Sequence, residues 1–168
     1  KDLPGTEFDE TYTYTANGLR ETVTDGQGTT TYQYDELNRL NRRIDLDGTT
    51  IAYSYDAAGN RTSVQIPSGT TAYSFDAQNR LKTVTDSEGG VTTYTYNAVG
   101  NLEHTEFPNS TVEIREYDEL HRLLYIETSG SEGIIASFRY TLDETGNRIA
   151  VEEHDGRRVV YEYDDLYR

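Results

Sequence analysis

The chain alternates short stretches rich in tyrosine, threonine and valine with short polar stretches, and this pattern returns about every 21 residues. In one such unit, residues 29–34 are β-branched or aromatic except Gln33, and 35–38 are typical of a turn. A second extended run follows at 39–46, and Asp47-Gly48 turns again. The pattern predicts two strands of about six to eight residues and two turns in each unit. Helix is disfavoured, because apolar positions alternate at two and do not recur at three and four.

The motif behind the repeat is Tyr-x-Tyr-Asp. Its second aromatic position is occupied eight times, at intervals of 20 to 23 residues, by Tyr14, Tyr34, Tyr55, Phe75, Tyr96, Tyr117, Tyr140 and Tyr163. Repeats of this length are typical of solenoids and other arrays of one small unit. The sequence therefore predicts an all-β repeat array over residues 1–168: about eight stacked antiparallel β-hairpins forming one continuous curved sheet.

A turn slot follows each aromatic pair, four residues after the second aromatic position. It holds residue types that tolerate a positive φ: Gly18, Asn38, Gly59, Asn79, Gly100, His121 and, in a seventh unit with two extra residues, Gly146. Tyr167 departs from this rule in the last unit. The slot is expected to hold a left-handed residue that closes a short hairpin.

Two further positions repeat with the same period. The sixth place after the second aromatic position is leucine or arginine: Leu40, Leu81, Leu102 and Leu123, or Arg20, Arg61 and Arg148. The ninth place holds Val23, Val64, Val84, Thr105, Ile126 and, counted with the two extra residues of the seventh unit, Val151, with Arg43 as the exception. Places three apart point to opposite faces of a regular strand. We therefore expect apolar contacts on both faces of the sheet.

The composition favours a thin sheet with half-exposed faces. Only 34% of residues are hydrophobic and the net charge is −15, which is typical of disorder, but 15 tyrosines with many threonines and valines favour strands. The lack of cysteine excludes disulfides and thiolate chemistry. The excess of carboxylates disfavours nucleic acid as a partner, and no apolar run is long enough to insert into a membrane. The lack of methionine indicates a piece of a longer chain, and no secretory signal opens it.

Three kinds of residue are candidates for chemistry. The aspartates of the motif could bind divalent cations or cap the turns, and capping is favoured because no calcium-loop pattern accompanies them: Asp35, Asp56, Asp76, Asp118 and Asp164. His104, His121 and His154 are too scattered for a metal motif. The tyrosines could stack on sugar rings or on one another, and their presence in every unit favours the structural role. No nucleophile or phosphate-binding motif is present, so we expect no enzyme activity, cofactor or metal.

The units resemble the RHS or YD repeats, whose form is Y-x-Y-D-x-x-G/N-R-L. The segment Tyr32-Gln33-Tyr34-Asp35-Glu36-Leu37-Asn38-Arg39-Leu40 is close to that form, and the resemblance covers residues 8–168. The family includes bacterial Rhs and wall-associated toxins, cocoon subunits of insecticidal toxin complexes, and teneurins. Known shells have more repeats than this chain. No self-cleaving residues are carried over, because no proline here follows an aspartate.

The resemblance implies a non-catalytic scaffold, part of a shell or extracellular stalk that encapsulates or presents a C-terminal toxin or cargo. The implied partners are neighbouring repeats of a parent protein and an encapsulated C-terminal domain, and the implied location is secreted or on the cell surface. The alternative is an adhesion module that binds a glycan or a protein on another cell.

Overall fold

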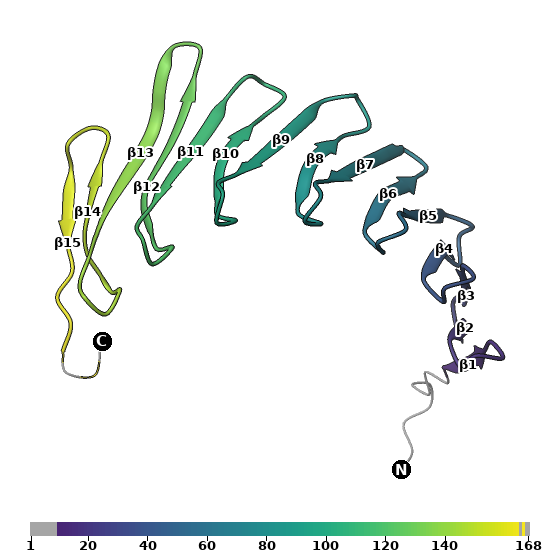
Figure 1. The fold of residues 1–168 in the computed structure, drawn as a ribbon. Coiled ribbons are helices and arrows are strands. Elements are labelled where there is room, and N and C mark those ends of the chain that lie inside the picture. The colour runs from purple at the N-terminus through teal and green to yellow at the C-terminus, as the bar shows by residue number, and fades with distance from the viewer. Residues whose placement is uncertain (1–9, 165, 167–168) are drawn as a thin grey trace. The chain divides into compact units, whose positions relative to one another are not determined.

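The computed structural model describes residues 10–164 and 166, which form fifteen strands and no helix (Figure 1). Most strands have five to seven residues, slightly fewer than the six to eight that the sequence predicts. They are β1 (Thr11–Tyr14), β2 (Arg20–Asp25), β3 (Gly28–Tyr34), β4 (Leu40–Ile44), β5 (Thr50–Tyr55), β6 (Arg61–Ile66), β7 (Gly69–Phe75), β8 (Leu81–Thr85), β9 (Val91–Tyr96), β10 (Leu102–Glu106), β11 (Val112–Tyr117), β12 (Leu123–Gly130), β13 (Gly133–Leu142), β14 (Arg148–Glu153) and β15 (Arg158–Val160).

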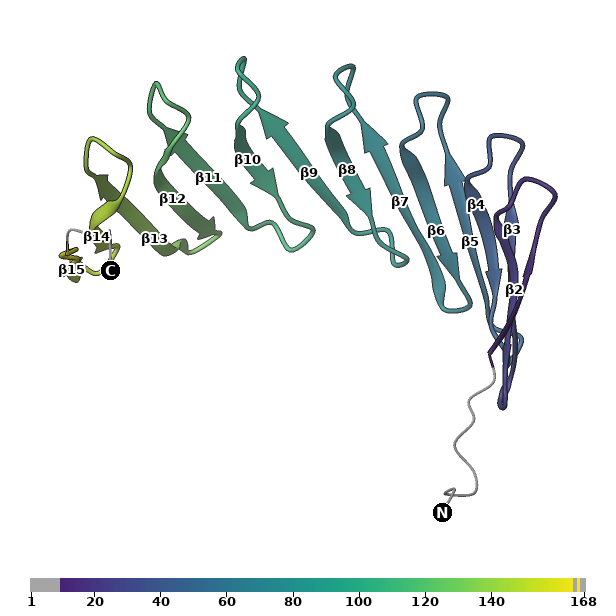
Figure 2. The same cartoon turned by 90° about the horizontal axis from the view of Figure 1, so that it is seen from below.

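The described strands form one antiparallel sheet in which the order of strands follows the order of the chain. Figure 2 shows this for strands β2 to β7, which lie side by side in the order of the chain. The predicted class, an all-β array of stacked antiparallel hairpins, is confirmed. Such an array puts each hairpin in contact with its chain neighbours alone, so its stability is local.

The sheet divides into two compact parts, which we call the N-terminal part and the C-terminal part. The first holds β1–β7 with residues 85–89, and the second holds residues 81–84 with β9–β15. Neither has a thick core: among the described residues, the buried ones are Ala150, Val151, Thr105 and Ser137. Stability must therefore come from half-buried side chains and from hydrogen bonds.

A β-bulge follows the turn slot in the units whose register is known. In β5 and β6, Ser54 pairs with Ser63 and Tyr55 with Arg61, which leaves Thr62 unpaired. The same shift occurs at the seventh place of other units, at Glu21, Asn41, Glu103, Leu124 and Ile149. An extra residue restores the phase of the side chains. The sixth and ninth places consequently share the tyrosine face, and our expectation that they lie on opposite faces is wrong.

The opposite side of the sheet, which we call the second face, is polar in β4–β7. Most of its side chains are short, and the longer ones are Arg42, Ile44 and Gln65, of which Arg42 is charged. By alternation along the strands and the cross-strand register, its residues are Arg42, Ile44, Thr50, Ala52, Ser54, Ser63, Gln65, Thr70, Ala72 and Ser74.

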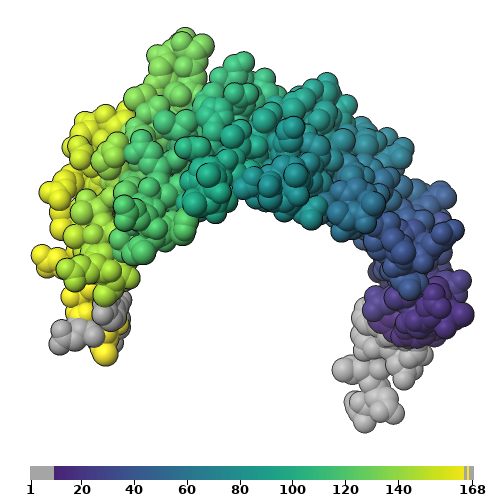
Figure 3. All heavy atoms as spheres, in the orientation of Figure 1, coloured from purple at the N-terminus to yellow at the C-terminus, as the bar shows by residue number. Residues whose placement is uncertain are grey.

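The seventh unit is aligned differently from our prediction. Leu142, not Tyr140, occupies the place of the second aromatic residue, because Leu142 pairs with Arg148 and Tyr140 with Val151. Asp143 is then the aspartate of the motif. The extra residues lie instead in the β12–β13 hairpin, whose strands have eight and ten residues. Its tip stands out beyond its neighbours as the light-green projection of Figure 3.

Candidate functional site: the tyrosine ladder and its turns

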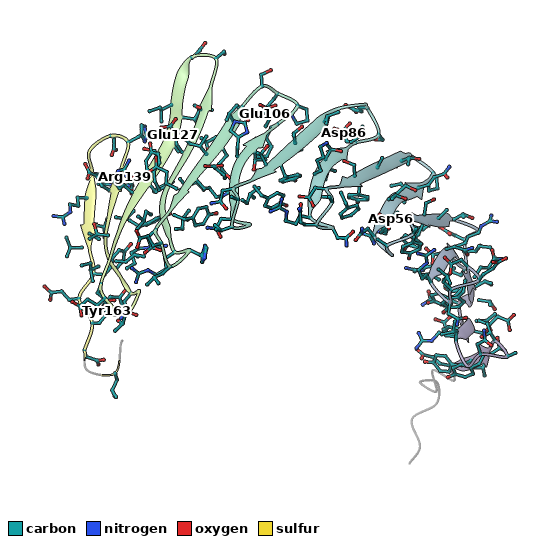
Figure 4. All side chains as sticks on the ribbon, in the orientation of Figure 1. Asp56, Asp86, Glu106, Glu127, Arg139 and Tyr163 are labelled. Atoms are coloured by element: carbon teal, nitrogen blue, oxygen red, sulfur yellow. The ribbon has the colours of Figure 1, made fainter. Side chains whose placement is uncertain are left out.

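The tyrosine at the second aromatic position ties each unit to the one before it. Tyr55 donates a hydrogen bond from its hydroxyl to the carbonyl oxygen of Leu40, over 2.8 Å. The acceptor is always the residue at the sixth place of the preceding unit. The same bond joins Tyr34 to Arg20, Tyr96 to Leu81, Tyr117 to Leu102 and Tyr163, labelled in Figure 4, to Arg148. This bond explains why the motif prefers tyrosine, since phenylalanine, as at position 75, cannot make it.

Arginines at the sixth place pack against tyrosine rings. The guanidinium of Arg61 lies 5.9 Å from the ring centre of Tyr53 and 5.6 Å from that of Tyr73. Arg148 lies 4.1 Å from the ring of Tyr140. Leucine and arginine can share this place because the arginine stem covers apolar surface while its charge faces the rings. The rings are therefore engaged with arginines of the same array, a contact that sequence reasoning missed.

The backbone is left-handed at the turn slot in every unit that the prediction names. The φ angle is positive at the glycines and also at Asn38, Asn79 and His121, at 60° to 63°. The amide N–H of the slot residue donates to the carbonyl oxygen of the residue that begins the turn, as from Asn38 to Asp35. Tyr167, which departs from the slot rule, lies outside the described residues.

The aspartate of the motif caps the turn that follows it. Asp35 Oδ1 accepts hydrogen bonds from the amides of Leu37 and Arg39, both at 2.9 Å, and its Oδ2 accepts from Arg39 Nε at 2.7 Å. Asp76 and Asp118 repeat these contacts with Arg80 and Arg122. In the intervening units an asparagine replaces the arginine, as Asn60 does at Asp56 (Figure 4). These contacts satisfy the turn amides.

Capping makes the carboxylates more acidic. The pKa of Asp35 is lowered, first by the hydrogen bond from the backbone amide of Arg39. The effect is largest at Asp143, where hydrogen bonds from the side chains of Asn147 and Thr145 lower the pKa to about 2. A hydrogen bond donated to an ionised carboxylate favours that ionised form.

Acid is expected to weaken the array in a defined window. A carboxylate with a lowered pKa in the folded state stabilises the fold above its unfolded value, about 4, and this contribution is lost as the pH falls through the folded value. Stability should therefore drop between about pH 4 and pH 2. In Asp143→Asn, the side chain at 143 does not titrate, so the drop should be smaller. The free energies of unfolding of the wild type and the variant, measured with urea, should therefore converge as the pH falls. Glu132→Gln controls for charge. A constant gap between wild type and Asp143→Asn would contradict this role.

The turns alternate between two types along the chain. Glycine fills the slot in odd units, while Asn38, Asn79 and His121 fill it in even units. The side-chain amide of an odd unit then donates to the slot side chain of the next unit: Asn60 to Asn79 at 2.9 Å, and Asn17 to Asn38 at 3.0 Å. Asn101 pairs in the same way with His121 Nδ1. The alternation is visible in the sequence, but these contacts between neighbouring units are needed to explain it.

The described part of the chain shows no cluster suited to a metal ion. No group of three or more His, Asp or Glu side chains comes together among those residues. His104 lies on β10, His121 in its turn slot and His154 in the turn between β14 and β15. Among the same residues, no helix is long and apolar enough to cross a membrane.

A solved structure shares this fold. A crystal structure of TcdB2–TccC3 without its hypervariable C-terminal region matches 95% of this chain with a TM-score of 0.77 and 18% identity. The match covers 10% of that chain. The TcdB2–TccC3 complex and the Tc holotoxin pore of Photorhabdus luminescens also match, at 17% and 16% identity with TM-scores of 0.43 and 0.41, and 14% and 13% of those chains are covered. No curated protein matches the sequence.

The sequence also matches the family model of the RHS repeat in three stretches, residues 14–50, 42–71 and 75–112, which together span more than half of the chain. The motif positions inside these stretches are those whose contacts build the array. The chain therefore belongs to the RHS repeat family.

Proposed function

We propose that this chain is a non-catalytic wall segment of a larger protein, one continuous repeat array in a shell or extracellular stalk that encloses or presents a C-terminal toxin or cargo. On this proposal its partners are the neighbouring repeats of the parent protein and the enclosed domain, and the parent is secreted or displayed at the cell surface.

The observation that carries the proposal is that the polar groups of the motif are used inside the array. Tyrosine hydroxyls bind the preceding unit, as Tyr55 binds Leu40. Aspartates bind the amides of their own turn, and Arg39 Nη1 reaches forward to the carbonyl oxygen of Asp56 at 3.0 Å. Residues engaged in this way build a wall, and they are not arranged to act on a substrate.

The two faces of the N-terminal part of the sheet support the same role. Tyrosines and arginines brace one face, while short polar side chains such as Thr50, Ser54 and Ser63 cover the second. A polar surface avoids sticking to a partly unfolded guest, because exposed apolar patches promote association. The matched TcdB2–TccC3 structure, in which a chain of this length spans a tenth of the whole, supports a place within a much longer protein.

The experiment is protease protection of the cargo in the full parent protein. The C-terminal domain should resist digestion while the wall is intact and become cleavable when Gly69→Val opens it. Gln78→Ala, in a turn, is the matched control and should leave protection unchanged. A C-terminal domain digested equally fast in all three proteins, or a parent without such a domain, would refute the shell.

A further inference from the structure

The β12–β13 hairpin has an edge that no described strand covers. Strand β13 pairs with β12 through residues 133–139, but β14 pairs only with residues 138–142. The last backbone contact on that side is the hydrogen bond from the amide of His154 to the carbonyl oxygen of Ser137, at 3.1 Å. Beyond this point the chain turns into β15, while the hairpin continues and its tip projects past the β14–β15 turn (Figure 1).

The open edge offers backbone hydrogen bonds to a further strand. In an antiparallel strand, N–H and C=O groups point in turn toward the neighbour on each side. Along residues 133–136, the groups that point away from β12 meet no described residue. Sheets usually protect such edges with charged residues, proline or a bulge, because an open edge accepts another chain. This segment is bulged at Ile135, but it contains no charge and no proline.

The side chains along this edge are apolar and exposed. Ile134 is 53% exposed and Ile135 is 56% exposed. They lie in the part of the hairpin that exceeds the repeat, since its strands have eight and ten residues where most others have five to seven. A strand laid beside them would bring its own side chains to about 5 Å and remove apolar surface from water.

The charge around the tip selects the partner. Glu132 makes no ion pair or hydrogen bond with a described residue. The arginines of β11, β13 and the β14–β15 connection are already paired with glutamates: Arg115, Arg139 and Arg157. The negative charge of the tip is therefore uncompensated, in a chain whose net charge is −15. A second copy of the chain would add more negative charge, whereas a basic segment would be attracted.

We propose that the outer edge of residues 133–136 binds an extended segment of a partner protein as an added β-strand. The segment covers Ile134 and Ile135 with β-branched or other apolar side chains and sets a lysine or arginine beside Glu132. Main-chain hydrogen bonds supply affinity in this mode of binding, and the side chains supply specificity. The site lies on the projecting hairpin and does not depend on the shell role.

The test is a titration of the full chain with a capped synthetic peptide of sequence KVTVK, followed by amide chemical shifts in NMR. Shifts should centre on residues 133–137. Ile134→Lys should weaken binding at least ten-fold, because it places a positive charge on the edge. Glu132→Gln should weaken it roughly two- to five-fold, the size of one exposed charge pair. Val99→Lys adds the same charge at a 66% exposed turn residue of another unit, and this matched control should bind like wild type.

A second peptide shows whether the backbone is read. Methylation of its valine and threonine amides keeps the side chains but removes hydrogen-bond donors, so this peptide should bind at least ten-fold more weakly. Equal binding of the two peptides would overturn strand addition. Absent or scattered shifts, or binding that Ile134→Lys leaves unchanged while thermal unfolding shows the variant folded, would overturn the site. A wild-type dimer in sedimentation that Ile134→Lys abolishes would overturn the partner assignment in favour of a second copy.

Discussion

Replacing Gly69 with valine is expected to destabilise the N-terminal part of the sheet by about 3 kcal/mol or more. Gly69 opens β7 with φ of +152°, and a Cβ atom there would lie 2.3 Å from the Cβ of Ser87 in a neighbouring turn. Backbone strain and a steric clash therefore add. Gly28 has the same relation to Leu46, with a Cβ separation of 3.0 Å. The measurement is urea unfolding of the chain followed by circular dichroism.

Gly59→Val is the control that separates these two causes. Gly59 has φ of +95° but nothing within 4 Å of an added Cβ atom. It should report strain alone, about 1–3 kcal/mol for a β-branched residue in the left-handed region. If Gly69→Val lowers the free energy of unfolding by no more than Gly59→Val does, the close approach of the two turns is not what requires glycine at position 69.

Removing the ring of Tyr55 is expected to cost on the order of 2–4 kcal/mol, in the range of other large-to-small substitutions. Tyr55→Ala deletes the hydrogen bond to Leu40 and the surface on which the Arg39 guanidinium rests, 4.6 Å from the ring centre. Tyr55→Phe keeps the ring and should lose only the hydrogen bond, about 1 kcal/mol. Thermal or urea unfolding measures both.

Hydrogen exchange shows whether this damage stays local. Each hairpin contacts only its neighbours, so faster exchange after Tyr55→Ala should concentrate in β3 to β6 and leave β11 to β14 at wild-type rates. A uniform rise along the chain would mean that the array unfolds as one cooperative body.

The period of the sequence predicted the hairpins and the turn slot well, because both depend on residue types with strong local preferences. Glycine, asparagine and histidine tolerate a left-handed backbone, and Tyr32 and Tyr34 favour a strand. These preferences act within a few residues and so appear directly in the pattern.

The bulge could not be predicted, because its residues share no chemistry. Glu21, Thr62 and Leu124 all occupy it, and its cause is the register of two strands and not a local preference. The alignment of the seventh unit failed for a related reason. Phe138 and Tyr140 mimic the aromatic pair, but Asp143 and Gly146 fix the turn, and the register follows the turn.

The contacts between neighbouring repeats could not be predicted from the sequence either. Aspartate in a turn suggests capping, which the sequence favoured, but the forward bond from Asn60 to Asn79 joins residues 19 positions apart. Likewise Ile134 and Ile135 are ordinary strand residues until the register shows that β14 does not reach them. Relations across strands depend on register, which a single sequence specifies only indirectly.

The alternation of the turns also limits how such a protein can change length during evolution. Loss of a single unit with asparagine or histidine in its slot would set two glycine slots beside each other, and an asparagine such as Asn60 would face a neighbour without a side-chain acceptor. Loss or duplication of two units at once restores every such bond. Recombination between repeats is therefore expected to be tolerated in steps of about 42 residues and selected against in steps of about 21.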